Sequence, residues 1–253
     1  MRNIALQLYT VRETAKHDFI GTLKEVAAMG YKGVEGGGNM GDLSPRELRK
    51  VLDDLGLNFV SGHITMDHIK SGFDSLIEAY VTLGAKYIGV AWVGEEWRKT
   101  AADWQRAAHT MEKAAMLCQK SDLTFFYHNH DFEFKQIDGK YGFDILFDSA
   151  DPGLLKSEMD VYWVTKGGAD AVTYVNKYAG RVPLLHIKDM TKDEARTFEI
   201  IGEGSIDFDA VLAAGDMAGV DWFIVEQDLC PKGELVSARQ SYQNIVSRGW
   251  LGK

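Results

Sequence analysis

The stretch "YHNHDFEF", residues 127–134, gathers two imidazoles, an amide and two carboxylates directly after an apolar run. The whole chain has only seven histidines. Residues i and i+2 of a strand share a face, so His128 and His130 can point the same way. One ring could bind a metal or orient a carboxylate while the other acts as a base near neutral pH. The competing interpretation is two ordinary polar residues at a strand edge.

Three later segments have the same form, an apolar run that ends in a potential metal ligand. They are "SEMDVYW", "LLHIKDM" and "FIVEQD", and the ligands are Asp160, His186 and Glu226. A single acidic residue after a strand is often only its first solvated position. Several strands ending this way favour a shared site instead. Strand alternation places Glu158 and Tyr162 beside Asp160, Lys188 beside His186, and Asp228 beside Glu226, as neighbours that could orient a ligand or contact substrate.

Short β-rich runs alternate with segments of helical periodicity, which predicts βα units and a parallel sheet. Eight units can be counted, and no linker divides them, so residues 1–253 are predicted to form a single (β/α)8 TIM barrel. The alternative, an open doubly wound sheet, should have a Gly-rich turn after its first strand, where "QLYTVRE" stands. The predicted strands cover 4–8, 34–35, 58–63, 87–92, 124–128, 154–160, 184–188 and 222–226; the helices lie near 18–29, 45–55, 73–83, 101–120, 142–149, 169–179, 208–218 and 235–247.

In such a barrel the carboxyl ends of all strands meet on one face, where catalytic groups belong. Nearly every predicted strand ends in a polar or aromatic residue. Burying such a ring of groups unpaired is costly, and a bound divalent metal would remove most of that cost. The strand-end residues are Gln7, Glu35, His63, Trp92, His128, Asp160, His186 and Glu226.

Composition narrows the class of protein. The 37 acidic and 28 basic residues give a net charge of −9, which disfavours a nucleic-acid partner. The sequence shows neither a signal-peptide pattern nor a long apolar run, so a soluble cytoplasmic protein with no membrane contact is expected. Cys118 and Cys230 are far apart and fit reduced thiols. Whether the chain forms a homo-oligomer is left open.

The motifs "IALQLYTVRE", "YHNHDFEF", "EMDVYWVTKGG", "LLHIKDM", "GEGSIDF" and "FIVEQD", in this order, resemble the sugar phosphate isomerase/epimerase family of the xylose isomerase-like TIM barrels. The group includes D-tagatose 3-epimerases and inosose isomerases and dehydratases. The resemblance covers essentially the whole chain and implies one divalent metal held by strands five to eight. It places Asp160, His186 and Glu226 among the ligands, with glutamates near the metal as bases.

The first ligand departs from the family pattern, because the position that usually holds a glutamate is His128. The sequence predicts that Glu133 folds back to the metal, with Asp131 as a weaker candidate. Three carboxylates and one imidazole would suit manganese, cobalt or magnesium. If His128 is the ligand instead, two carboxylates and two imidazoles favour zinc or another borderline metal.

The expected chemistry is removal of a proton alpha to the carbonyl of a keto-sugar or sugar phosphate, through an enediolate. Glu226 and Glu133 are the predicted bases, and the predicted substrate contacts are His63, Trp92, Lys188, Glu35 and Tyr162. Isomerisation or epimerisation is the primary expectation. Because His128 and His130 offer a base independent of the metal, dehydration or another elimination is the serious alternative. A phosphodiesterase and a non-enzymatic sugar binder are weaker ones.

Overall fold

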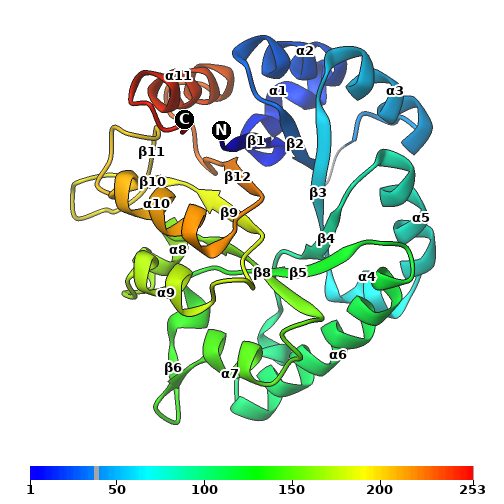
Figure 1. Cartoon of the computed structure of the whole chain (residues 1–253), viewed down its shortest axis with the longest axis vertical. Helices are drawn as coiled ribbons and strands as arrows, with labels where there is room; N and C mark the ends of the chain where they lie inside the picture. The colour runs from blue at the N-terminus through cyan, green and yellow to red at the C-terminus, as the bar shows by residue number, and fades with distance from the viewer. Residues whose placement is uncertain (37–39, 253) are drawn as a thin grey trace.

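The computed structural model describes residues 1–36 and 40–252. Eight parallel strands close into a barrel in the order β1-β12-β9-β8-β5-β4-β3-β2, which confirms the predicted TIM barrel (Figure 1). The barrel strands are β1 (Asn3–Gln7), β2 (Gly33–Gly36), β3 (Asn58–Ile64), β4 (Tyr87–Val90), β5 (Thr124–His128), β8 (Leu155–Asp160), β9 (Leu184–Ile187) and β12 (Trp222–Val225).

Helices surround the barrel, and the first and last segments of the chain lie side by side (Figure 1). The Arg2 N–H donates to the Leu251 carbonyl at 2.7 Å. No helix in the described part of the chain is both long and apolar enough to cross a membrane. The longer helices are α2 (Phe19–Met29), α3 (Pro45–Leu55), α5 (Phe73–Leu83), α6 (Ala101–Gln119), α7 (Gly142–Asp148), α9 (Ala171–Lys177), α10 (Phe208–Ala218) and α11 (Glu234–Ser247).

Local sequence signals fix several of these boundaries. Ser44 caps α3 in a reciprocal capping box with Glu47, Pro45 opens the helix, and Gly56 ends it at φ +67°. The bounds of α3 are those that the sequence predicts, 45–55. β4 ends two residues earlier than expected, because its pairing with β3 stops at the Ile64–Val90 pair.

Short elements occupy the connections at the barrel mouth. They are the helices α1 (Arg12–His17), α4 (Met66–Lys70) and α8 (Val161–Lys166), the 3-10 turns η1 (Leu8–Val11), η2 (Glu95–Trp97) and η3 (Phe132–Phe134), and two antiparallel pairs of strands. One pair is β6 (Gln136–Ile137) with β7 (Lys140–Tyr141), and the other is β10 (Asp189–Met190) with β11 (Phe198–Glu199). The second pair lies in the long connection between β9 and α10.

The barrel interior is layered, apolar below and polar above. A separate buried cluster of Ala5, Val60, Tyr87, Phe126, Leu184 and Ile224 fills its lower part. Two residues further along each strand, the side chain points to the same face and lies one layer higher in the barrel. Phe126 thus leads to His128, Leu184 to His186, and Ile224 to Glu226. Strand alternation alone therefore places the polar residues above the buried apolar cluster, toward the carboxyl-terminal face.

Candidate active site

Four buried residues bring potential metal-binding atoms together at the top of the barrel. His128, Asp160, His186 and Glu226, called the first cluster, each offer one donor atom, and these atoms all lie within 4.8 Å of one another. Nδ1 of His186 lies 2.9 Å from Glu226 Oε2 and 3.8 Å from Asp160 Oδ2. Nε2 of His128 lies 3.4 Å from the same Asp160 oxygen. The structure thus assembles the three predicted ligands with the fourth residue from strand five.

The first cluster has unsatisfied atoms that suit a cation. Both ring nitrogens of His128 are buried without a hydrogen-bond partner in the described structure, and Oδ2 of Asp160 has ion-pair contacts but no assigned hydrogen bond. Leaving such groups unpaired is costly, and coordination to a metal satisfies them. The Lys188 ammonium, 2.7 Å from Glu226 Oε2 and 3.1 Å from Asp160 Oδ2, supplies only one positive charge to two carboxylates. This donor set therefore fits a divalent metal ion.

A second cluster, Glu35, His63, Glu158 and His186, also brings donor atoms within 4.8 Å. Here most groups pair with one another, although Oε1 of Glu158 is buried without a hydrogen-bond partner in the described structure. His63 Nε2 lies 2.6 Å from Glu158 Oε2, and His186 Nε2 lies 2.7 Å from Glu35 Oε1. Burial lowers the pKa of both imidazoles, but the two carboxylates outweigh it and the net pKa of each is raised. Two carboxylates thus pair with two imidazoles in the second cluster.

Glu35 is buried beneath the site and does not line the cavity, so the structure does not place it as the predicted substrate contact. Gln7 Nε2 donates to its Oε1 at 2.6 Å, and the Ser61 hydroxyl donates to Oε2. With Nε2 of His186 directed to Glu35, its Nδ1 faces the first cluster, 2.9 Å from Glu226 Oε2. Carboxylate–histidine pairs of this kind commonly orient metal-binding imidazoles.

Glu133 is not brought to the other predicted ligands. The turn η3 folds its carboxylate against its own loop, where it accepts hydrogen bonds from the Tyr127 hydroxyl and from the His130 N–H, the latter at 2.9 Å. Burial raises the pKa of Glu133 to about 8, although the hydrogen bonds from Tyr127 and the backbone oppose it. Neither donor cluster in the described residues contains Glu133, whereas the first contains His128.

This arrangement gives a direct test of the fourth ligand. His128→Gln is expected to weaken zinc binding by about 10–100-fold, because it removes a donor from a buried set. Glu133→Gln keeps the shape of a side chain that already serves its own loop, so zinc affinity should stay within about twofold of the wild type. Titration calorimetry on both metal-free variants measures the difference. A larger loss in Glu133→Gln than in His128→Gln would contradict this geometry.

Tyr162 also departs from the expectation that it contacts substrate. Asp160 caps α8 by accepting from the Trp163 N–H at 3.0 Å, so strand alternation ends at Asp160. Tyr162 consequently turns into the core, where its ring stacks on that of Phe198 with the centroids 4.6 Å apart. Its hydroxyl donates a hydrogen bond to the Arg196 carbonyl at 2.9 Å. The neighbouring Trp163 lines the cavity in its place.

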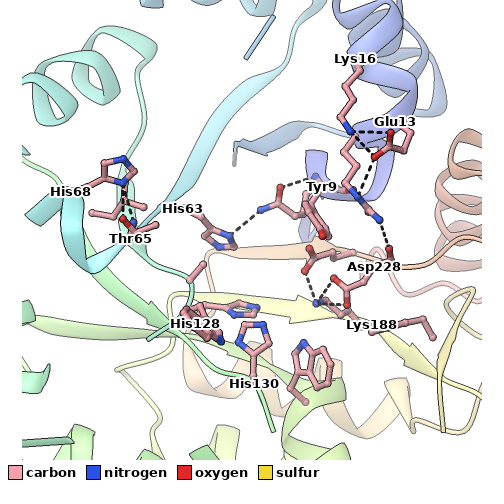
Figure 2. Close-up of a pocket in the computed structure, with 18 residues that line it drawn as sticks. Tyr9, Glu13, Lys16, His63, Thr65, His68, His128, His130, Lys188 and Asp228 are labelled. Atoms are coloured by element: carbon pink, nitrogen blue, oxygen red, sulfur yellow. Dashed lines mark hydrogen bonds and ion pairs between the residues drawn. The ribbon is translucent and has the colours of Figure 1, made fainter. Parts of the chain in front are cut away.

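A single cavity of about 1040 Å³ opens above the first cluster (Figure 2). His128 and Glu226 are part of its floor, and the predicted contacts His63, Trp92 and Lys188 line its wall. Three imidazoles stand in a row across it: the rings of His63 and His128 are 5.3 Å apart, and those of His128 and His130 are 5.0 Å apart. Burial is the largest cause that lowers the pKa of His130 well below its usual value. The charges of the nearby His128 and Lys188 lower it further.

Two further acidic residues belong to the site, and each lies two residues from a predicted ligand. Glu158, two residues before Asp160, completes the second cluster. Asp228 lines the cavity and lies 3.2 Å from the Lys188 ammonium. Burial raises the pKa of Asp228 to about 6, with Lys188 opposing the rise. The Lys188 ammonium therefore pairs with three carboxylates, those of Asp160, Glu226 and Asp228.

A closed eight-stranded barrel with potential metal ligands at the carboxyl ends of its strands has the architecture of TIM-barrel enzymes. The family described as "Xylose isomerase-like TIM barrel" matches residues 23–238. The chain belongs to that family.

Individual relatives are distant. An inosose dehydratase from Geobacillus kaustophilus is 26% identical over 249 residues, covering 83% of this chain and 80% of that protein. A sugar phosphate isomerase/epimerase structure from Parabacteroides distasonis has a TM-score of 0.89 at 22% identity, covering 99% of this chain and 96% of that one. An IolI protein with a bound zinc atom has a TM-score of 0.76 at 15% identity, with coverage of 98% and 97%. At these identities the two solved structures share the fold.

Proposed function

We propose that the protein eliminates water from a keto-sugar or a cyclic keto-polyol of the inosose type. The observation that carries this proposal is the row of His63, His128 and His130 across the cavity, beside the first cluster. Elimination needs a base at one carbon and an acid at the neighbouring leaving group, and the outer two imidazoles of the row provide a pair. The inosose dehydratases among the relatives support this proposal over epimerisation.

The first cluster would hold one divalent metal, and its two imidazoles and two carboxylates favour zinc, cobalt or manganese over magnesium. When bound, such an ion supplies Lewis-acid polarisation of a ketone oxygen. His130 then accepts the proton from the carbon alpha to the ketone, and the C–H electrons form a carbon–carbon double bond. The C–O bond at the next carbon breaks, and His63 protonates the departing hydroxide, so that one molecule of water is lost.

A second candidate is isomerisation or epimerisation of the same class of substrate, including a sugar phosphate. It is favoured by Glu226, a carboxylate that lines the cavity together with the imidazoles. Two bases could remove a proton on one side of the substrate and return one on the other.

The proposal also includes a cytoplasmic location, which the two free cysteines support.

Proton NMR in heavy water separates the two reactions. Zinc- or manganese-loaded protein is incubated with an inosose and with open-chain keto-sugars. We expect loss of water and an unsaturated ketone, with activity about 10²–10⁴-fold lower in His130→Gln at unchanged metal content. The exposed His109→Gln serves as the control. Deuterium in recovered substrate or its epimer, without loss of water, would establish the second candidate, and tight binding without either change would refute both.

A further inference from the structure

The cavity is larger than a keto-sugar ring requires. Its volume of about 1040 Å³ lies at the upper end of the ~300–1,000 Å³ typical of pockets for drug-sized ligands. A six-membered polyol held at the first cluster would fill only the floor. The remainder is continuous with the floor and reaches Tyr9, Trp92 and Thr65 at the mouth. A second group on the substrate has room there.

We infer that the outer part of the cavity is a subsite for an uncharged, apolar ring carried by the keto-sugar, such as an aromatic aglycone. This inference rests on the proposed function for the identity of the sugar part. It adds the chemical class of the substituent, which neither the first cluster nor the row of imidazoles determines.

The outer wall carries aromatic side chains with free surface. Tyr9, after β1, is 45% exposed, and Trp92, after β4, is 50% exposed. Trp163 from α8 and Phe198 from β11 line the same cavity. Cations hold two of these rings in place: the Arg12 guanidinium lies 4.0 Å from the centroid of Tyr9, and that of Arg98 lies 5.6 Å from Trp92. Half-exposed, fixed aromatic rings offer stacking surface at little entropic cost.

The charges of the wall argue against a phosphate as the substituent. Arg12 donates to the carbonyls of Tyr9 at 2.7 Å and Asp228 at 3.0 Å. Lys16 is paired with Glu13 at 2.8 Å (Figure 2). Lys188, deeper in the cavity, is shared among the carboxylates of the site. In the described residues, each Lys or Arg that lines the cavity is thus already engaged, and Glu13 and Asp228 would repel an anion.

Three probes that share one keto-sugar and differ in a phenyl, methyl or phosphate substituent test the inference by their kcat/KM values. We expect the phenyl compound to exceed the other two by roughly tenfold or more. Trp92→Ala should remove most of this preference by raising KM for the phenyl compound alone. Equal values for phenyl and methyl, or a preference for phosphate, would overturn the subsite.

Equilibrium binding keeps this test separate from the reaction. Phenyl and methyl glycosides of the unoxidised sugar are titrated into zinc-loaded protein, so the readout survives if the proposed elimination is wrong. We again expect roughly tenfold tighter binding of the phenyl glycoside, lost in Trp92→Ala and kept in Trp97→Ala, a tryptophan outside the cavity. If the preference persists in the double variant Tyr9→Ala/Trp92→Ala, the aromatic wall is not the subsite.

Discussion

Glu226→Gln is expected to lower kcat/KM by about a thousandfold or more and to prevent stable metal binding. The carboxylate is nearly fully buried and stands between His186 and Lys188, 2.9 Å and 2.7 Å away. The amide keeps the volume of the side chain but removes the charge that a divalent ion and the Lys188 ammonium both need. In the variant, the Lys188 ammonium would still pair with the buried Asp160 carboxylate. Asp160 would then be less able to bind a metal ion.

Metal analysis, steady-state kinetics and thermal unfolding together decide this prediction. A chelator should lower the melting temperature of the wild type, because a ligand that binds only the folded state stabilises it. It should leave the melting temperature of Glu226→Gln unchanged. Glu13→Gln, which alters an exposed carboxylate at the mouth of the same cavity, is the matched control. Full activity of Glu226→Gln, or of wild-type protein in chelator, would remove the metal from the proposed reaction.

The second large effect is expected in the loop that follows β9. Asp189, which is buried, accepts four backbone N–H groups: its Oδ1 from Met190 at 2.8 Å and Ile206 at 3.2 Å, and its Oδ2 from Gly202 at 2.8 Å and Gly204 at 2.9 Å. One side chain thus closes the excursion that carries Phe198 to the cavity. Asp189→Ala leaves these donors without their partner and should cost on the order of 3–5 kcal/mol of unfolding free energy.

Urea unfolding of three variants measures this contribution. Asp189→Asn keeps one acceptor oxygen and should fall between wild type and Asp189→Ala. Asp193→Ala removes an exposed carboxylate from the same loop and should change the unfolding free energy by no more than about 0.5 kcal/mol. A cost of less than about 1 kcal/mol for Asp189→Ala would mean that other contacts hold the loop.

Much of the scaffold could be predicted because its signals are local. The strand at 124–128 and the helix at 45–55 were expected with the bounds that the structure has. Barrel geometry then gave the convergence of Asp160, His186 and Glu226, since residues at strand ends must share one face. That these residues bind a metal stays a prediction.

The side chains beyond the strand ends could not be placed in this way. Glu133 was expected at the metal, but the turn η3 directs its carboxylate to Tyr127 and the His130 N–H. Tyr162 was expected in the cavity, but the cap at Asp160 starts a helix and turns the ring into the core. In both cases the backbone turn that follows the strand, held by hydrogen bonds, directs the side chain away from the position that was expected.

The sequence by itself determined the periodic pattern. From that pattern follow the barrel, the buried apolar cluster in its lower part and the layer of ionisable residues above it. Only the tertiary structure decided which of those residues pair. His63 pairs with Glu158, which is 95 positions away in the sequence, and His186 pairs with Glu35, which is 151 positions away. The physical reason is that alternation fixes the face and height of a side chain within its own strand, whereas its partner depends on how eight strands close around a common axis.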